Sequence, residues 1–409
     1  MTYKRTLTPV ERYYVSCDNH KPPHKTPCLN QMMLEGIGDF DESKWQKAVE
    51  IASQKNPGSR LVLSGKLGFS KWKASNKPAR LRIVDGSNWD GMSDANCPFQ
   101  GAALPPFEGP TTEVVLIKGN PARIAVRTHH GAMDGRGTQT FIDDVFRVLN
   151  GEEPLGENST ITDLELAKQI NGGEQRFGEF IPDDAIPPTG KPDGNSQGSH
   201  WIRRRLPGKH KQVLAKAAIA ISELTNRFGE SNTRIQLPVD MRPRAEGIRS
   251  TGNLTGTIMM NVNPSTTPDE WDNTIRQLIE EQREAELPRF ASSIPLNWFG
   301  WLPLSLMKYA NKKLSVKRLT TGLYRTHAII SNLGRLPISN YSGGGFEAKC
   351  GFFIPPEFEA TAFFLTMSGS PDGIDFVLRI PNVLATNNRM EKALDYILSK
   401  YNIESLVAA

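Results

Sequence analysis

Apolar side chains recur with helical spacing in several segments of the chain. The clearest such segment follows Asp41, a residue type that can cap a helix through its side-chain oxygen. Its apolar positions recur at i, i+3, i+4 and i+7 and are Trp45, Ala48, Val49 and Ala52. This pattern predicts an amphipathic helix that ends before Asn56-Pro57-Gly58. Similar patterns predict further helices over 137–150, 210–228, 268–286 and 387–401.

Strand patterns alternate with these helices. Residues 112–118 and 122–128 form two apolar arms around Gly119-Asn120-Pro121, which predicts a β-hairpin. A second hairpin is predicted from the arms 361–367 and 374–380 around Ser370-Pro371-Asp372-Gly373. Single strands are expected over 60–63, 234–240 and 328–331. Both halves therefore combine helices with antiparallel strands, and we predict the α/β (mixed α+β) class.

A polar segment over 171–200, rich in Gly, Pro, Asn and Asp, separates these two halves. The chain has 409 residues, enough for two to three domains. We predict an N-terminal subdomain over 1–170, a linker over 171–200 and a C-terminal subdomain over 201–409. The 35 Gly and 29 Pro predict long loops. Residues 64–110 and 290–325 look loop-rich and carry no clear element.

Charge and cysteine content narrow the class of protein. A net charge of +5 is too mild to indicate a nucleic-acid surface, although it suits a phosphate-bearing ligand. No stretch approaches the roughly 18 apolar residues of a membrane span, and the first ten residues are too polar for a signal peptide. Four Cys do not make a disulfide framework. We therefore expect a cytoplasmic, monomeric protein with no nucleic-acid partner.

The strongest chemical signal is His129-His130-Gly131-Ala132-Met133-Asp134-Gly135. If the alternation of the strand over 122–128 continues, His130 falls on its mainly apolar face and His129 on the opposite face. A buried neutral histidine, with an unperturbed pKa of about 6.5, can act as a general base. Asp134 can fix the turn, and Gly135 permits a tight backbone. The alternative interpretation is a core histidine followed by a helix-capping aspartate.

This HHxxxDG block resembles the signature of the chloramphenicol acetyltransferase-like superfamily. That group includes condensation domains of nonribosomal peptide synthetases, polyketide-associated acyltransferases, alcohol acetyltransferases and wax-ester/diacylglycerol acyltransferases. Other segments resemble the family in the expected order, beginning with a starting strand at Leu7-Thr8-Pro9. The remaining similar segments are 40–45, 56–60, 237–244, 252–256 and 330–334. The plant branch carries a DFGWG block where this chain has Ser342-Gly-Gly-Gly-Phe346, which argues against that branch.

The resemblance implies two subdomains of similar fold, each a mainly antiparallel sheet flanked by helices, with the active site in a tunnel between them. It implies that His130 is the catalytic base, within a motif completed by His129 and Gly135. Asp134 is then structural, and Arg242 is the candidate for its partner. In the same way, Ser331 and Asn332 lie where the family places groups near the developing oxyanion.

The resemblance also implies the co-substrates. An acyl thioester of coenzyme A or of carrier-protein phosphopantetheine would enter from one face, and an amine or hydroxyl acceptor from the other. Transfer would occur directly in a ternary complex, with no metal and no tightly bound cofactor. The product would be an amide or ester of natural-product or lipid biosynthesis. Two alternatives stay open: a catalytically silent protein that binds a carrier protein or ligand, and a cyclisation or dehydration on the same scaffold.

Two weaker signals remain. Arg203, Arg204 and Arg205 form a basic cluster that could contact donor phosphates or an acidic carrier protein, although a solvated strand edge explains it equally. The run Cys17, His20, His24 and Cys28 consists of zinc-ligand types. Its spacing is compressed and prolines interrupt it, so we predict a loop rather than a metal site.

Overall fold

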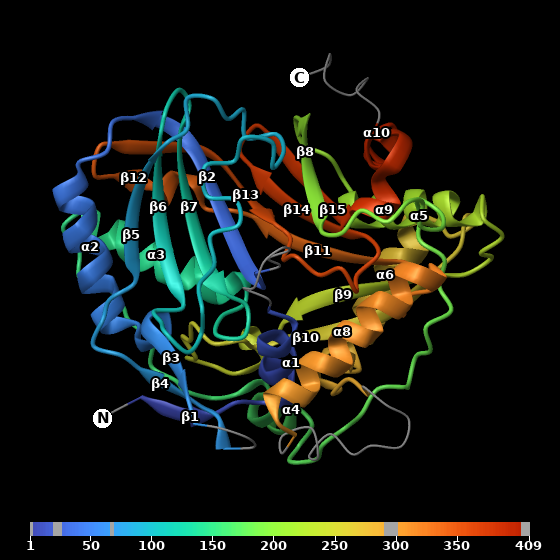
Figure 1. Ribbon diagram of the computed structural model, residues 1–409, viewed down its shortest axis with the longest axis horizontal. Helices are drawn as coiled ribbons and strands as arrows, with labels where there is room; N and C mark the ends of the chain where they lie inside the picture. The colour runs from blue at the N-terminus through green and yellow to red at the C-terminus, as the bar shows by residue number, and fades with distance from the viewer. Residues whose placement is uncertain (1–2, 19–26, 66–68, 290–301, 402–409) are drawn as a thin grey trace.

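The computed structural model describes residues 3–18, 27–65, 69–289 and 302–401 of the chain. Within these ranges the strands form two six-stranded sheets and one three-stranded sheet. The two large sheets lie side by side, and helices flank both (Figure 1). The predicted fold class, a mixture of helices and strands around two large sheets, is confirmed.

The first large sheet has the strand order β12-β13-β2-β7-β6-β5. Its strands are β2 (Leu29–Gly38), β5 (Arg80–Asp85), β6 (Thr112–Lys118), β7 (Ala122–His129), β12 (Ser342–Gly343) and β13 (Phe346–Ile354). All neighbours are antiparallel except β5 and β6. The β6–β7 pair is the predicted hairpin, and β7 is buried along its whole length. Helices α2 (Glu42–Lys55) and α3 (Gly135–Leu149) share an apolar core with this sheet.

The second large sheet has the order β10-β9-β11-β14-β15-β8. Its strands are β8 (Ser199–Pro207), β9 (Thr233–Asp240), β10 (Thr255–Val262), β11 (Ala328–Arg335), β14 (Phe364–Ser370) and β15 (Gly373–Pro381). Strand β11 runs parallel to both neighbours, and the other pairs are antiparallel. Helices α5 (Val213–Asn226), α6 (Pro268–Glu280), α9 (Asn382–Ala385) and α10 (Arg389–Leu398) belong to its core. The hairpin predicted over 361–380 is the β14–β15 pair.

The sheets do not follow the predicted division of the chain by sequence. Strands β12 and β13 belong to the C-terminal half, yet β13 pairs with β2 and completes the first sheet. Strand β13 also contacts the second sheet, because the Gly351 amide donates to Ser370 Oγ of β14 at 3.3 Å. Strand β13 therefore joins the two halves, and the predicted boundary assigns it to the half whose sheet it does not belong to.

A third layer packs beside the end of the first sheet. It contains the strands β1 (Lys4–Thr6), β3 (Leu61–Ser64) and β4 (Lys71–Ala74) and the helix α1 (Pro9–Cys17). Helix α8 (Leu304–Thr321) packs against α1, and helix α4 (Asp163–Ile170) contacts β10 of the second sheet (Figure 1). Strand β4, strand β5 and helix α8 lie in the two segments where no element was expected. Helix α8 escaped prediction because its apolar side chains are spread around the helix, and only Met307 among them is buried.

The start of the chain corrects one expectation. Residues 7–12 resemble a starting strand of the family, but the structure begins helix α1 at Pro9. Thr8 accepts from the Glu11 amide, and Glu11 in turn accepts from the Thr8 amide at 3.0 Å, which is a capping box. Proline at the first helical position fits because its missing N–H has no partner to lose there.

The segment that was predicted to be a linker over 171–200 has no helix before β8 begins at Ser199. It is nevertheless tied to the second half of the chain by several hydrogen bonds. The Gly178 amide donates to the Leu287 carbonyl at 3.1 Å, and the Ala185 amide donates to the Tyr324 carbonyl at 2.9 Å. Between these points the segment lines the main cavity of the molecule.

Candidate active site

The HHxxxDG block forms the turn between β7 and α3. Strand β7 ends at His129, where the His130 amide donates to the Cys28 carbonyl at 2.8 Å. The chain then turns, and the Ala132 amide donates back to the His129 carbonyl at 2.8 Å. Asp134 caps α3, because its carboxylate accepts from the Gly137 amide at 2.7 Å. The motif is therefore a strand–turn–helix junction, as its pattern predicts.

His129 corrects the expectation drawn from strand alternation. Its side chain was predicted on the outer face of the strand, but it is fully buried. Its Nδ1 accepts from the Gly131 amide at 3.0 Å, and its Nε2 lies 3.2 Å from Asp18 Oδ2. The ring meets Trp72 of β4 edge-on at 6.3 Å. Solvent does not reach this face of β7 because the third layer covers it. His129 therefore supports the turn from the face opposite His130.

Asp134 and Arg242 form the ion pair expected from the resemblance. Arg242 donates from Nη1 to Asp134 Oδ2 at 3.1 Å and from Nη2 to Oδ1 at 3.0 Å. The Leu254 amide and the Thr255 hydroxyl also donate to Oδ2, at 2.8 and 2.9 Å. Burial alone would raise the pKa of Asp134, but Arg242 and these hydrogen bonds outweigh it and lower that pKa. Asp134 thus ties the turn to the second half of the molecule.

Three side chains from distant segments hold His130. The ring of Tyr14 on α1 stacks on the imidazole, with 3.9 Å between centroids and 14° between planes. Asn30 Nδ2 lies 3.0 Å from His130 Nδ1 and donates to the Met133 carbonyl at 2.6 Å. Asn253 Nδ2 donates to the His130 carbonyl at 2.7 Å. Sequence reasoning missed Tyr14 and Asn30, because no local pattern distinguishes them.

Burial keeps the His130 imidazole uncharged at neutral pH. Loss of solvation lowers its pKa to about 4, against the opposing effect of the Asp134 carboxylate. Contacts with the main-chain carbonyls of His130 and Met133 also oppose the shift. The neutral ring carries hydrogen on only one of its two nitrogens, so the other nitrogen has a free electron pair that can take a proton.

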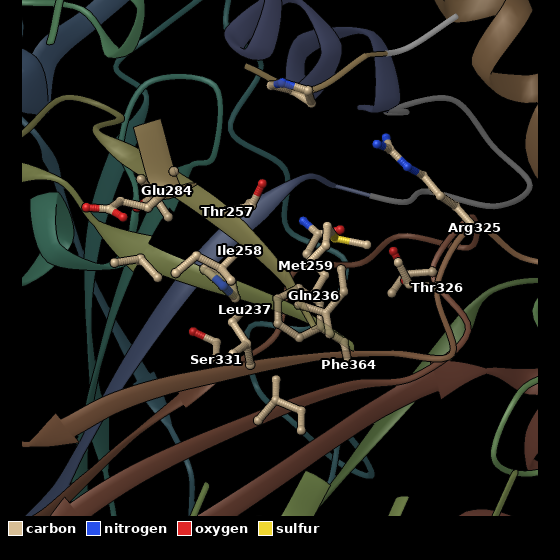
Figure 2. Close-up of a pocket in the computed structure, with 18 of the residues that line it drawn as sticks. Gln236, Leu237, Thr257, Ile258, Met259, Glu284, Arg325, Thr326, Ser331 and Phe364 are labelled. Carbon is tan, nitrogen blue, oxygen red and sulfur yellow. The ribbon is translucent and has the colours of Figure 1, made fainter. Parts of the chain in front are cut away.

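His130 lies at the wall of a cavity of about 1380 Å³. Residues of both large sheets line this cavity, including Gly135 at the start of α3 and Phe353 on β13. Figure 2 shows its floor, where Gln236, Thr257 and Ser331 extend from β9, β10 and β11. The cavity is therefore enclosed by both halves of the chain.

Ser331 and Asn332, the two oxyanion candidates, both line this cavity. Ser331 is partly buried, and Asn332 is exposed. The Asn332 Oδ1 atom accepts from the Gly334 amide at 3.0 Å, which stabilises the bulge in β11. The Asn332 amide nitrogen and the Ser331 hydroxyl are the groups that remain to act as donors.

The basic cluster of β8 does not reach the cavity. Arg203 is buried, donates to Asp375 Oδ1 at 2.7 Å and lies 3.9 Å above the Phe352 ring. The prediction of a donor phosphate at Arg203 is therefore wrong, because its guanidinium holds β8 to β15. Arg204 and Arg205 also pair with carboxylates, and neither lines the cavity.

The Cys and His run lies only partly within the described residues. His20 and His24 fall outside them, while Cys28 is buried and Cys17 is partly buried. Within the described ranges, no three His, Cys, Asp or Glu side chains gather as a metal site. None of the helices in those ranges is long and apolar enough to cross a membrane.

Solved structures of condensation domains and of an acyltransferase share this two-sheet fold. The condensation domain of the monacolin K polyketide synthase MokA is similar at a TM-score of 0.67 and 13% identity, over 97% of this chain and 96% of that one. The first condensation domain of the calcium-dependent antibiotic synthetase is similar at a TM-score of 0.61 and 13% identity, over 97% and 96%.

A third solved structure extends this likeness beyond condensation domains. TRI101 of F. sporotrichioides, complexed with coenzyme A and T-2, is similar at a TM-score of 0.57 and 14% identity, over 98% and 99%. The resemblance to the chloramphenicol acetyltransferase-like superfamily is thus confirmed at the level of the fold. No protein-family model matches the chain, and no curated protein matches it.

Proposed function

We propose that the chain is an acyltransferase of the condensation-domain kind. It transfers an acyl group from a thioester of coenzyme A or of carrier-bound phosphopantetheine to an amine or hydroxyl, in natural-product or lipid biosynthesis in the cytoplasm. The observation that carries the proposal is the neutral His130 imidazole at the wall of a large cavity shared by both halves. A neutral ring with one free nitrogen is the form that a general base requires.

The proposed reaction is direct transfer. The acceptor nitrogen or oxygen attacks the thioester carbonyl carbon while its proton moves to His130 Nε2. The tetrahedral intermediate then collapses, the carbon–sulfur bond breaks, and the proton passes from the imidazolium to the leaving thiolate. Such general-base assistance contributes roughly 10²- to 10⁴-fold to the rate. Asp134 and Arg242 touch no reacting atom in this scheme, and they hold the turn that carries His130.

The negative charge on the carbonyl oxygen needs a donor. Ser331 supplies a hydroxyl on the cavity floor, and the Asn332 amide lies on the next residue of β11. A donor aimed at a developing oxyanion contributes about 3–4 kcal/mol to transition-state stabilisation. We assign this role to Ser331 first, because its hydroxyl makes no hydrogen bond with the described residues.

The solved neighbours support a coenzyme A thioester as one donor. The starter condensation domain of rhizomide synthetase RzmA was solved with C8-CoA and Leu-SNAC, at a TM-score of 0.60 and 13% identity. TRI101 was solved with coenzyme A. The intact histidine with its free nitrogen favours catalysis over a silent binding role.

The test is turnover of His130→Ala with a panel of acyl-CoA and acyl-carrier thioesters and of amine and hydroxyl acceptors. Loss of His130 should reduce turnover roughly 10²- to 10⁴-fold. The matched control is His210→Ala, a partly buried histidine after β8 that is absent from the cavity lining. Undiminished turnover in the His130 variant would refute the proposal. Product masses without the acyl group would favour cyclisation or dehydration instead.

A further inference from the structure

One end of the cavity carries several arginines, and most of them are paired. Arg318 on α8 donates to both oxygens of Asp183, at 2.7 and 3.1 Å. Arg234 on β9 pairs with Asp184. Both acids belong to the 171–198 segment, which passes beside this end of the cavity. Two arginines are thus neutralised by two aspartates, and a third arginine beside them is not.

That third arginine is Arg325, in the loop between α8 and β11. Among the described residues, no carboxylate or carbonyl accepts from its guanidinium, and its buried Nε has no hydrogen-bond partner. Its side chain lines the cavity and extends over the floor formed by Gln236 and Met259 (Figure 2). Burial lowers the pKa of Arg325, the charges of Arg318 and Arg234 act in the same direction, and the Asp183 carboxylate opposes them only in part. Burying an unpaired cation in this position costs free energy unless an anion pairs with it.

Neutral donors lie on the same side of the cavity. Thr326 follows Arg325 in the chain, and the side chains of Thr326 and Gln236 line the same cavity (Figure 2). Neither side chain makes a hydrogen bond with another described residue. An arginine fork, a hydroxyl and an amide are the groups that bind phosphate or carboxylate oxygens in proteins.

This end of the cavity is also connected to His130. Arg325 and Tyr13 line the same cavity. The ring of Tyr13 lies 5.8 Å from that of Tyr14, which stacks on His130 at 3.9 Å. One cavity therefore joins Arg325 to the histidine, so a molecule that fills it contacts both.

We propose that Arg325, with Thr326 and Gln236, forms an anion-binding subsite that holds a phosphate or carboxylate oxygen of a substrate. The inference rests on the proposed function only for calling the bound molecule a substrate. The phosphate would come from the donor's coenzyme A or phosphopantetheine, and the carboxylate from the acyl group or the acceptor. Phosphate and carboxylate oxygens would bind to the same donors in this subsite, so the experiment must distinguish the two groups.

The test is isothermal titration calorimetry of the wild-type chain, Arg325→Gln and Arg325→Lys with three probes. The probes are coenzyme A, pantetheine, which lacks the phosphates, and glutarate, which carries carboxylates. Arg204→Gln is the matched control, because it removes the same charge from an arginine outside the cavity. Arg325→Gln should weaken binding of at least one anionic probe roughly tenfold or more. Pantetheine should bind equally to all variants.

Each outcome decides the proposal. Weaker binding of coenzyme A alone identifies a donor phosphate, and weaker binding of glutarate alone identifies a substrate carboxylate. Equal binding of both anions by Arg325→Gln and wild type overturns the subsite, as does a wild-type chain that binds neither. Arg325→Lys keeps the charge but loses the fork, so its affinity should fall between the other two. Calorimetry measures binding without turnover, so Arg325→Gln should weaken anion binding equally in an inactive His130→Ala background. Failure of the anion subsite can therefore be distinguished from failure of the proposed function.

Discussion

The environment of His130 sets its protonation state more strongly than its residue type does. The sequence suggested a base with a pKa near its ordinary value of about 6.5. Burial, to which the stacked Tyr14 ring contributes, instead lowers the pKa of His130 to about 4. The ring is thus already neutral throughout the physiological range. Its base form is lost only in acid, where the free electron pair of the ring takes up a proton.

This pKa predicts the acid limb of the rate profile. Plotted against pH, kcat/KM should stay level above about pH 5 and fall tenfold per unit below about pH 4. Asp134 stays ionised over most of this range because its pKa is lowered too. The measurement is initial rates between pH 3.5 and 8 in buffers of constant ionic strength. A limb centred near pH 6.5 would contradict the burial argument.

Asn30 offers a sharper test at the same scale. Asn30→Asp places a carboxylate 3 Å from His130 Nδ1, which favours the imidazolium and raises the pKa of His130. The acid limb should therefore move to higher pH, by roughly 1–3 units. Asn30→Ala is the matched control, because it also removes the hydrogen bond to Met133 but adds no charge. Identical limbs in the two variants would show that another group controls the profile.

At the scale of elements, the start of α3 is packed against the segment before β10. A methyl group added at Gly137 would lie 2.1 Å from the Thr251 carbonyl oxygen. That segment also supplies the Gly252 carbonyl to Arg242 at 2.6 Å and the Leu254 amide to Asp134. Gly137 therefore permits the close approach that lets one aspartate join the two halves.

The prediction is that Gly137→Ala destabilises the protein. Helix propensity alone would favour alanine by about 1 kcal/mol, but overlap with a backbone oxygen costs about 1–3 kcal/mol and forces the two segments apart. The free energy of unfolding from urea titration should fall, together with turnover. Gly369→Ala on β14 is the control, because its new methyl group would have its nearest atom at 3.4 Å. Equal stability of the two variants would contradict this packing argument.

At the scale of the molecule, the two halves are interlocked rather than merely adjacent. Strand β13 completes the first sheet, and Arg203 of the second sheet lies 3.4 Å from Glu35 of β2. The same Glu35 accepts from Arg123 of β7 at 2.7 Å. One apolar cluster draws side chains from both sheets, including Met33 and Val377.

This interlocking predicts a single unfolding transition. Removing the second half would strip β13 from β2, so neither large sheet should survive loss of the other. Pulsed hydrogen exchange at increasing urea should give peptides from β7 and β14 the same midpoint. The full chain serves as its own control, since both peptides are read in each sample. Two separate midpoints would show that the halves fold independently.

Local patterns predicted many of the elements, but not β2, β10 or α4. The helix after Asp41 and both hairpins followed from spacing and turn residues, because those interactions lie within a few residues. Helix α8 and strand β13 were not predicted. The apolar residues of α8 form no stripe, and β13 is defined by its pairing with a strand some 300 residues earlier.

The sequence by itself determined the HHxxxDG turn, the general class of fold and, through the family resemblance, the pairing of Asp134 with Arg242. Only the tertiary structure decided that His129 is buried, that Arg203 serves the fold and that the Arg325 Nε atom has no hydrogen-bond partner among the described residues. The physical reason is distance along the chain. Asn30 and Tyr14 lie 100 residues or more from His130, and burial depends on what covers a face, which strand alternation cannot show.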